Sequence, residues 1–451
     1  MAFRPPKPAT RPRFATPLRR LLRFRKDIFA SQPEHLYRAW MAEQKTPFYN
    51  SYFINDPELL DDILKARPMA FPKSEIIAKT LRDLLGASVF VTNGALWEKQ
   101  RRIIDPAFAG GRLKPTFPAM LAAVEAALAR LEPGEVEIEF EASHLAADII
   151  FRTLFSIPIT HETASEVFEN FRTYQRAQPV LNLAELMRLP SWVPRFRRKA
   201  VVSSAATIRS LLSDLVAERA RQIESGTAPD DLATKIMTFA DPDTGEGFTP
   251  EDMVDQVAIF FLAGHETSAS ALGWALYLLA ESPEVQARVA AEVDATLGSS
   301  PPEFADLTRL TFTRDVFRET LRLYPPVPMM VRETKQTERF RGRAIKPGSL
   351  AILSPFHLQR HQRLWDAPDL FDPDRWSRRE SRENIRNHYM PFSAGSRICP
   401  GAGFAMIEGI LALAMIIRRF EITATARKPQ PVAHLTLRAK DGIWLKLTPR
   451  G

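Results

Sequence analysis

The stretch that decides the fold lies near the C-terminus and reads Pro391-Phe392-Ser393-Ala394-Gly395-Ser396-Arg397-Ile398-Cys399-Pro400-Gly401. It holds the only cysteine of the chain, and an apolar run from about Ala402 to Ile417 follows it. A thiolate just before a helix is favoured by the helix dipole and by free backbone N–H groups. Gly395 and Gly401 permit tight turns and let the backbone approach a flat ligand. The stretch indicates either a metal-binding thiolate on a rigid loop or a buried structural cysteine beside a helix start.

Composition and charge narrow the class of protein. The chain has 451 residues, of which 45% are hydrophobic, so it can bury a large core. The formal net charge of +8 favours acidic partners: nucleic acid, an anionic membrane or an acidic electron-transfer protein. We find no zinc-finger or RNA-binding signature, so no nucleic-acid partner is expected. A single cysteine excludes an intrachain disulfide, and we expect a cytoplasmic protein.

Residues 1–30 form a basic, proline-rich arm that holds nine Lys or Arg and one acidic residue. We expect this N-terminal arm to be flexible, with an organelle transit peptide or a loose membrane contact as alternatives. Residues 18–24 could form a short amphipathic turn. Residues 186–199 are apolar and then basic, which fits either a peripheral membrane contact or a loop beside a substrate entrance. No stretch resembles a linker, so residues 31–451 are expected to form a single domain.

The remaining pattern is mainly helical with local strand signals. Helices are expected over residues 119–131, 143–155, 200–224 and about 402–417, and strands over 48–54, on both sides of a Pro-Gly turn within 344–353, and after residue 420 through 447. The most informative helix begins at Thr249, which can cap it, and runs to about Ser282. Its apolar part, 257–280, is interrupted by charged and polar residues that would be costly at bilayer depth. We therefore expect a helix through a globular core and no transmembrane segment.

The interruption reads Ala263-Gly264-His265-Glu266-Thr267-Ser268 and places an acid beside an alcohol. Burying either group costs free energy unless it is satisfied. Gly264 lacks a side chain one turn before Thr267, which would make room for a small ligand beside the helix. Thr267 could then hydrogen-bond that ligand, and Glu266 could relay protons. The alternative is a helix kink at Gly264 with Thr267 bonded to a backbone carbonyl.

Charged side chains recur at fixed spacings elsewhere. Glu319 and Arg322, at i and i+3, share a helix face, and Arg375 lies in a turn-rich segment downstream. A network in which Glu319 bridges both arginines would lock the loop that leads to the cysteine; the alternative is ordinary solvated charges. Trp97 and Arg101, at i and i+4, could both donate to a carboxylate, or could be an aromatic anchor on a helix surface.

The histidines do not indicate a metal centre. His265-Glu266 is followed by Ala269 rather than His at the fifth position, which excludes a zinc peptidase motif. His357 and His361 are spaced i and i+4, but we see no third ligand in the local sequence. We expect both to be surface or capping residues.

Together, and in this order, the four motifs resemble the cytochrome P-450 superfamily of heme-thiolate monooxygenases over nearly the whole chain. The cysteine loop matches the family pattern at Phe392, Gly395, Arg397, Cys399 and Gly401. The resemblance implies a mainly α fold with a smaller β-rich region, a helical prism around a buried heme, in which residues 31–451 are one catalytic domain. The membrane-anchor helix of many eukaryotic members is missing, so the chain is similar to soluble bacterial members.

The resemblance also implies a role for each motif. Cys399 would be the axial ligand of the iron of heme b, with Phe392 and Gly401 in the same cofactor-binding loop. Four side chains would hold the heme propionates: Trp97, Arg101, Arg332 and Arg397. Glu319, Arg322 and Arg375 would form a structural network. Glu266 and Thr267 would be catalytic and would deliver protons during oxygen activation.

The implied reaction inserts one oxygen atom of O2 into a lipophilic small molecule. Electrons would come from a separate ferredoxin or flavodoxin with its reductase, whose usual acidity suits the basic chain. The substrate would contact apolar residues of the long helix and of the turn after Arg322, namely Phe260, Ala263, Val327 and Met329, although core filling by the methionine is an alternative. A peroxide-driven peroxygenase and a heme sensor without turnover are the rival functions; the acid–alcohol pair argues against the sensor.

Overall fold

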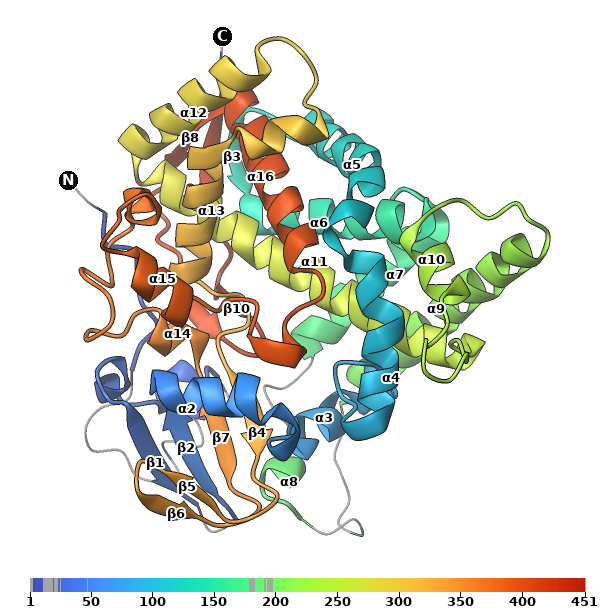
Figure 1. Cartoon of the computed structure of the whole chain (residues 1–451). Helices are drawn as coiled ribbons and strands as arrows, with labels where there is room; N and C mark the ends of the chain where they lie inside the picture. Colours follow the sequence, from blue (N-terminus) through green and yellow to red (C-terminus); the bar gives the residue numbers. More distant parts are fainter. Residues whose placement is uncertain are drawn as a thin grey trace. The chain divides into compact units, whose positions relative to one another are not determined.

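The structure, a computed structural model, describes residues 3–10, 19, 23–24, 26–46, 48–177, 183–189, 192 and 198–450 (Figure 1). The amphipathic turn predicted at 18–24 lies largely outside the described residues, and so does the second half of the segment predicted at 186–199. In the described part, the chain is mainly helical with small sheets, as predicted.

The described elements have the following bounds. The α-helices are α2 (Pro57–Asp61), α3 (Glu75–Leu85), α4 (Gly94–Ile104), α5 (Phe117–Arg130), α6 (Ile138–Phe155), α7 (Glu162–Ala177), α8 (Leu183–Leu186), α9 (Lys199–Glu224), α10 (Leu232–Thr238), α11 (Pro250–Ala280), α12 (Pro283–Leu297), α13 (Thr311–Leu323), α14 (Pro355–Leu358), α15 (Arg382–His388) and α16 (Ala402–Arg419). The strands are β1 (Met41–Lys45), β2 (Asn50–Ile54), β3 (Gly134–Glu137), β4 (Met330–Glu333), β5 (Glu338–Phe340), β6 (Arg343–Ile345), β7 (Leu350–Leu353), β8 (Phe420–Ala424), β9 (Pro431–Ala433), β10 (Leu437–Ala439) and β11 (Trp444–Pro449). Short helical turns are η1 (Phe29–Ser31), η2 (Glu34–Tyr37), η3 (Asp62–Ala66), η4 (Pro68–Ala70), η5 (Asp105–Phe108), η6 (Gly110–Arg112), η7 (Lys114–Thr116), η8 (Phe304–Thr308), η9 (Pro373–Trp376) and η10 (Gly395–Arg397).

The chain divides into two compact units. The first comprises Met1–Phe71, Val124–Ser143 and Thr267–Gly451, and the second comprises Pro72–Ala123 and His144–Glu266. All described strands belong to the first unit, whereas the described elements of the second unit are helical. One boundary between the units lies between η4 and α3, and the other three fall inside α5, α6 and α11. That residues 31–451 form a single domain stays a prediction.

The first unit is built around a four-stranded sheet of order β1-β2-β7-β4. β2 pairs with β7 in parallel, and the two outer pairings are antiparallel. The strands predicted within 344–353 are present, but they join different sheets: β6 pairs with β5, while β7 lies in the four-stranded sheet. The predicted C-terminal alternation forms β8 and β11, which extend a second sheet of order β3-β11-β8.

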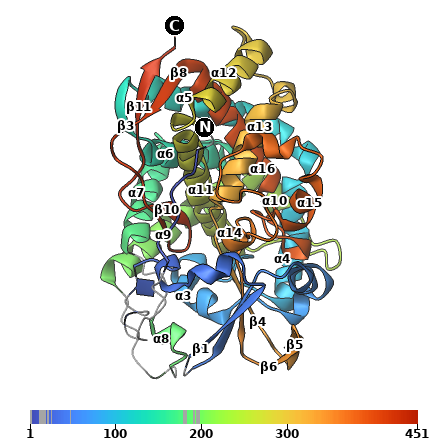
Figure 2. The same cartoon turned by 90° about the vertical axis from the view of Figure 1, so that its left-hand side faces the viewer.

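The predicted helices are present. α5, α9 and α16 begin and end within two residues of the predicted positions, whereas α6 begins at Ile138, five residues early. The Glu137 carboxylate accepts a 2.9 Å hydrogen bond from the amide of Phe140 and so stabilises this early start. At α11, Thr249 Oγ1 accepts from the amide of Asp252 over 3.1 Å, which confirms the predicted cap. Figures 1 and 2 show α11 as one unbroken helix, which does not favour the alternative of a kink at Gly264.

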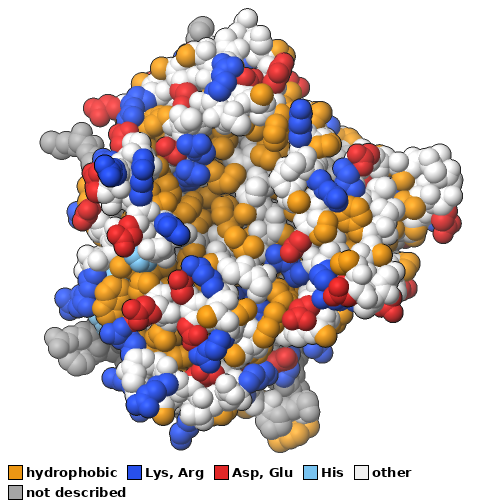
Figure 3. Space-filling view, in the orientation of Figure 1, with side chains coloured by type: hydrophobic (Ala, Val, Ile, Leu, Met, Phe, Trp, Pro, Cys, Tyr) orange, Lys and Arg blue, Asp and Glu red, His pale blue; other side chains and the backbone are white. Residues whose placement is uncertain are grey.

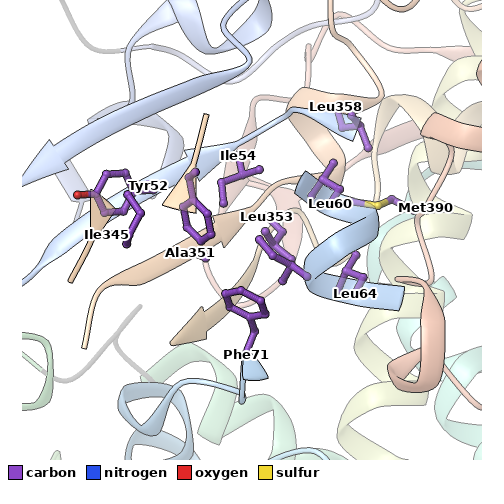
Figure 4. Packing of buried hydrophobic residues seen from close by; sticks show 12 residues of the cluster. Tyr52, Ile54, Leu60, Leu64, Phe71, Ile345, Ala351, Leu353, Leu358 and Met390 are labelled. Atoms are coloured by element: carbon purple, nitrogen blue, oxygen red, sulfur yellow. The ribbon is translucent and has the colours of Figure 1, made fainter. Parts of the chain in front are cut away.

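A hydrophobic core lies between the four-stranded sheet and the helical segment that follows β2. Figure 4 shows side chains of β2 and β7 packed against Leu60 and Leu64, with Met390 at the edge of the cluster. Burying side chains of this size stabilises a fold by about 1.5–3 kcal/mol each. Because Met390 directly precedes the cysteine loop, the start of that loop is anchored in this core.

Residues 3–10 differ from the expected flexible arm because they pack against other segments of the first unit, to which they belong. The carbonyl of Phe3 accepts a 3.0 Å hydrogen bond from the amide of Phe371, and the carbonyl of Pro6 accepts a 2.7 Å bond from the Tyr324 hydroxyl. Lys7 forms a 2.6 Å ion pair with Asp369. These partners hold the backbone in place, which the basic and proline-rich composition did not indicate.

By length and composition alone, α9 is the one described helix that could cross a membrane. A single such helix is weak support, because core helices of soluble proteins meet the same criteria. α9 packs against α7 and α3 within the second unit, and it carries a buried arginine, Arg219. We therefore interpret α9 as a helix of that compact unit.

Candidate active site

Backbone hydrogen bonds close the cysteine loop. The amide of Cys399 donates to the carbonyl of Phe392 over 2.9 Å, and the amide of Ile398 donates to the carbonyl of Gly395 over 3.1 Å. Gly395 has a φ of +68°, and a Cβ built there would collide with the backbone oxygen of Leu64. Both the left-handed backbone and the close approach require glycine at this position.

The cysteine of this loop occupies an exposed position. Cys399 is exposed and lies just before α16, whose N-cap is Gly401. A Cβ built on Gly401 would lie 3.9 Å from Sγ of Cys399. The exposure rules out the alternative of a buried structural cysteine. A thiolate here stands at the positive end of the α16 dipole, which stabilises its charge.

Two buried arginines of the first unit lie close enough to influence each other. Burial, and then the neighbouring charge of Arg397, lower the pKa of Arg332 on β4 to about 9. Arg397 Nη1 donates a 2.8 Å hydrogen bond to the carbonyl of Phe71. Within the described part of the chain, no carboxylate forms an ion pair with Arg332, whose Nη1 donates a 3.2 Å hydrogen bond to the carbonyl of Val331. A buried cation without a counter-ion is costly, so Arg332 fits an anionic ligand.

In the middle of α11, one face is less buried than the others. Residues 260, 263, 264 and 267, which are spaced for one helix face, are half-buried, or exposed in the case of Ala263. Glu266 and Thr267 are both half-buried rather than fully buried. A Cβ on Gly264 would collide with Ile150 of α6. The predicted room for a small ligand beside Gly264 is thus wrong, because Ile150 fills it; the open positions are Ala263 and Thr267.

The structure brings Glu319, Arg322 and Arg375 together as a fully buried network. Both carboxylate oxygens of Glu319 accept 2.8 Å bonds from Arg322, and Arg375 Nε lies 3.5 Å from Glu319 Oε1. Arg322 also donates to the carbonyls of Gln359, Pro368 and Leu370. The alternative of ordinary solvated charges is wrong, because all three side chains are buried. The network fixes the segment between α14 and η9 rather than touching the cysteine loop itself.

Trp97 and Arg101 lie on α4 in the second unit. The Arg101 guanidinium carbon is 5.9 Å from the centre of the Trp97 ring, and its Nε pairs with Asp105 over 2.6 Å. Trp97 is buried, which fits an anchoring side chain. The next residue, Arg102, pairs with the buried Asp241 over 2.6 Å and ties α4 to the loop before α11. The sequence analysis missed Asp241, because no pattern near Asp241 indicates that its partner is Arg102.

The predicted substrate contacts occupy half-buried or exposed positions. Phe260 lies with its ring centre 5.7 Å from that of Phe108. Val327 and Met329 are half-buried, and the Met329 sulfur accepts a 3.0 Å hydrogen bond from Gln32. Met330, in contrast, packs on the hydrophobic core of the first unit. Core filling therefore describes Met330 better than Met329.

His357 and His361 are both fully buried, so the expectation of surface residues is wrong. Nδ1 of His357 lies 2.8 Å from Oγ of Ser354, the N-cap of α14, which agrees with the capping alternative. His361 stacks on Trp40 with ring centres 4.5 Å apart. Across the described residues, no group of three His, Cys, Asp or Glu could hold a metal ion.

A model of the family named Cytochrome P-450 matches residues 27–446 of the chain. The chain belongs to this family. It is 33% identical over 401 residues to a cyclooctat-9-en-7-ol 5-monooxygenase of Streptomyces melanosporofaciens, which covers 88% of this chain and 84% of the relative. It is 32% identical over 407 residues to a pentalenene oxygenase of Streptomyces avermitilis, which covers 89% and 88%.

Solved cytochrome P-450 structures agree with the fold. The heme domain of a mutant cytochrome P450DA is 26% identical, with a TM-score of 0.80, and the match covers 91% of this chain and 90% of that one. The unmutated heme domain gives a TM-score of 0.83 at 24% identity. The chain is therefore a cytochrome P-450 monooxygenase, an oxidoreductase with a heme-thiolate cofactor that uses O2 and a redox partner.

The residues of this cytochrome P-450 fit its cofactor. The exposed sulfur of Cys399 at a helix start suits an iron ligand, and the unpaired charge of Arg332 beside Arg397 suits a propionate. Bound heme with a thiolate ligand supplies O–O bond cleavage and the oxidation of the substrate.

One buried acid of this cytochrome P-450 was missed by the sequence reasoning. Glu408 lies within α16, is 1% exposed, and accepts a 2.7 Å hydrogen bond from the hydroxyl of Ser268 of α11. A lone acid inside the apolar run from Ala402 to Ile417 was the available signal, of the same kind as Glu266 in α11.

Proposed function

We propose that the chain inserts one atom of O2 into a lipophilic small molecule at a heme b iron held by Cys399. The second oxygen atom leaves as water, and the reaction consumes two electrons and two protons. The observation that carries the proposal is the exposed sulfur of Cys399 on a glycine-flanked loop at the start of α16. Phe392 supports this loop because its carbonyl accepts a hydrogen bond from the amide of Cys399.

We assign cofactor binding to four further side chains. Arg332 and Arg397 offer two buried positive charges to carboxylates of the heme, and Trp97 and Arg101 of α4 are assigned the same task. Burial and, to a smaller extent, the charge of Arg397 lower the pKa of Arg332, and a carboxylate bound beside Arg332 would offset both effects. Glu319, Arg322 and Arg375 act as the structural network behind the loop.

Proton delivery is assigned to Glu266 and Thr267 of α11. Both are half-buried, so they can exchange protons with solvent while facing a ligand. Ala263, one helical turn before Thr267, is exposed. Replacing Thr267 with alanine should divert electrons from product to hydrogen peroxide.

A lipophilic substrate is supported by the apolar side chains at Phe260, Ala263, Val327 and Met329. The two Streptomyces relatives carry pentalenene and cyclooctat-9-en-7-ol in their names. We propose apolar ring compounds of that kind as the substrate class and use both as probes. A heme spin-state shift on titration with either would support the class, and no shift with both would contradict it.

A ferredoxin or flavodoxin with its reductase is the proposed electron donor, in the cytoplasm. The net charge is +8, and Figure 3 shows Lys and Arg side chains interspersed with Asp and Glu on the surface. An acidic carrier should therefore reduce the enzyme faster at low salt. A reduction rate that does not change with salt would remove the electrostatic part of this proposal.

The deciding experiment is the absorption spectrum of the ferrous–carbon monoxide complex of the heme-loaded chain. We expect the band of thiolate-bound heme, its loss in Cys399→Ala, and its retention in Ser396→Ala, an exposed neighbour in the same loop. A chain that takes up heme without this band contradicts the proposal. Peroxide-driven turnover that survives removal of Glu266 and Thr267 would favour the peroxygenase instead.

A further inference from the structure

A single side-chain hydrogen bond ties α16 to α11 deep in the first unit. Oγ of Ser268 lies 2.7 Å from Oε2 of Glu408, and both residues are buried. The other carboxylate oxygen, Oε1, is buried without a hydrogen-bond partner among the described residues. Nothing in the assigned site uses this pair.

The chemistry of the pair points to a neutral acid. No cation forms an ion pair with Glu408 in the described part of the chain, and an ionised carboxylate buried in this way is costly. Burial raises the pKa of Glu408 to about 8, although the hydrogen bond from Ser268 acts in the opposite direction. At neutral pH, the carboxyl group is therefore mostly protonated, and the bond to Ser268 joins two uncharged groups.

The position of the pair connects it to the site. Ser268 directly follows Thr267 on α11, and Glu408 lies on the helix that starts just after the Cys399 loop. α16 is itself fixed at the next residue, because a Cβ on Gly409 would collide with the ring of Phe317 of α13. Glu408 thus extends from a helix that packs closely against α13 at the next residue.

We propose that Glu408 is a positioning residue, a neutral carboxylic acid that fixes, through Ser268, the turn of α11 that carries Thr267. This inference rests on the proposed roles of Thr267 and Cys399. Apolar side chains alone pack without a preferred direction, whereas a hydrogen bond sets both distance and angle. One such bond beside Thr267 therefore restrains the turn of α11 that carries this residue.

The test uses the heme-loaded full chain and carbon monoxide as the probe. The C–O stretching frequency of the ferrous complex responds to polar groups that face the bound gas. We compare Glu408→Gln, Glu408→Leu, Ser268→Ala and Thr267→Ala. Glu292→Leu is the matched control, because Glu292 accepts a 2.8 Å bond from the Thr313 hydroxyl and so links α12 to α13 in the same unit.

The proposal predicts a shifted or broadened stretch in Glu408→Leu and Ser268→Ala, as in Thr267→Ala, and an unchanged stretch in Glu408→Gln and Glu292→Leu. The double variant Ser268→Ala with Glu408→Leu should show no larger change than either single variant. Rescue by glutamine separates positioning from proton donation, because glutamine keeps the hydrogen bond and carries no acidic proton. If Glu408→Leu loses heme, Ser268→Ala carries the test alone.

Two outcomes would overturn the proposal, and they are distinguishable. If Thr267→Ala shifts the stretch but Ser268→Ala does not, Glu408 does not position Thr267, and the proposed function stands. If Thr267→Ala leaves the stretch unchanged, the proposed role of Thr267 fails, and this inference fails with it.

Discussion

The backbone amide of Met390 donates a 2.9 Å hydrogen bond to Oε1 of Gln359. The Gln359 amide group in turn donates to the carbonyls of Leu321 and Arg322, each over 3.0 Å. Gln359 is fully buried, and Arg322 belongs to the network with Glu319. This one glutamine therefore joins α13 and its ion pair to the residue that leads into the cysteine loop.

We predict that Gln359→Leu weakens heme binding as well as stability. The substitution leaves the amide of Met390 and two carbonyls without their partner, and a buried unsatisfied group costs about 1–3 kcal/mol. Denaturant unfolding should show a loss of several kcal/mol, and less of the protein should carry thiolate-bound heme. Gln336→Leu is the control, since Gln336 is exposed. Equal effects of the two substitutions would refute the link.

Gly395→Ala should disrupt the cysteine loop more than an ordinary glycine substitution. Gly298 is a matched control, because its φ is +52° but a Cβ there would meet nothing within 4 Å. For Gly298→Ala we expect only the cost of the left-handed backbone, about 1–2 kcal/mol. Gly395→Ala adds the collision with Leu64 and should reduce the thiolate-type carbon monoxide band. A normal band in Gly395→Ala would mean that the loop tolerates a side chain.

Apart from Arg375, the parts of the site that the sequence predicted have partners close along the chain. Glu319 and Arg322 are three residues apart, and the loop that holds Cys399 is closed by its own backbone. The Ser268–Glu408 bond spans 140 residues, so no local pattern could indicate it. Likewise, His361 could not be placed, because its burial depends on stacking with the distant Trp40. Packing between distant segments, rather than propensity, decided these positions.

Arg219→Met should lower the stability of the fold strongly, whereas Arg221→Met should lower it only slightly. Arg219 of α9 pairs with Asp231 and donates a 2.9 Å bond to the carbonyl of Phe155, with its side chain only 5% exposed. Removing one partner of a buried pair costs about 3–5 kcal/mol. Arg221, paired with Glu218, has a 67% exposed side chain. Arg221→Met should cost at most about 1 kcal/mol. Thermal unfolding of both variants measures the difference, and similar melting temperatures would contradict the assignment.

The protonation of Glu408 predicts a specific dependence of stability on pH. The pKa of Glu408 is raised from 4.5 to about 8 by burial, so between these values the folded chain holds a proton that the unfolded chain has released. The contribution of this group to stability is full below about pH 4.5 and is lost as the pH rises through about 8. Glu408→Gln cannot ionise, so its unfolding free energy relative to the unaltered chain should increase between these two pH values and then level off. Urea unfolding at pH 5, 7 and 9 measures this difference, with Glu292→Gln as the control for another carboxylate that accepts a hydroxyl hydrogen bond. A difference that does not change with pH would mean that Glu408 is ionised in the folded chain, and that its bond to Ser268 is a charged one.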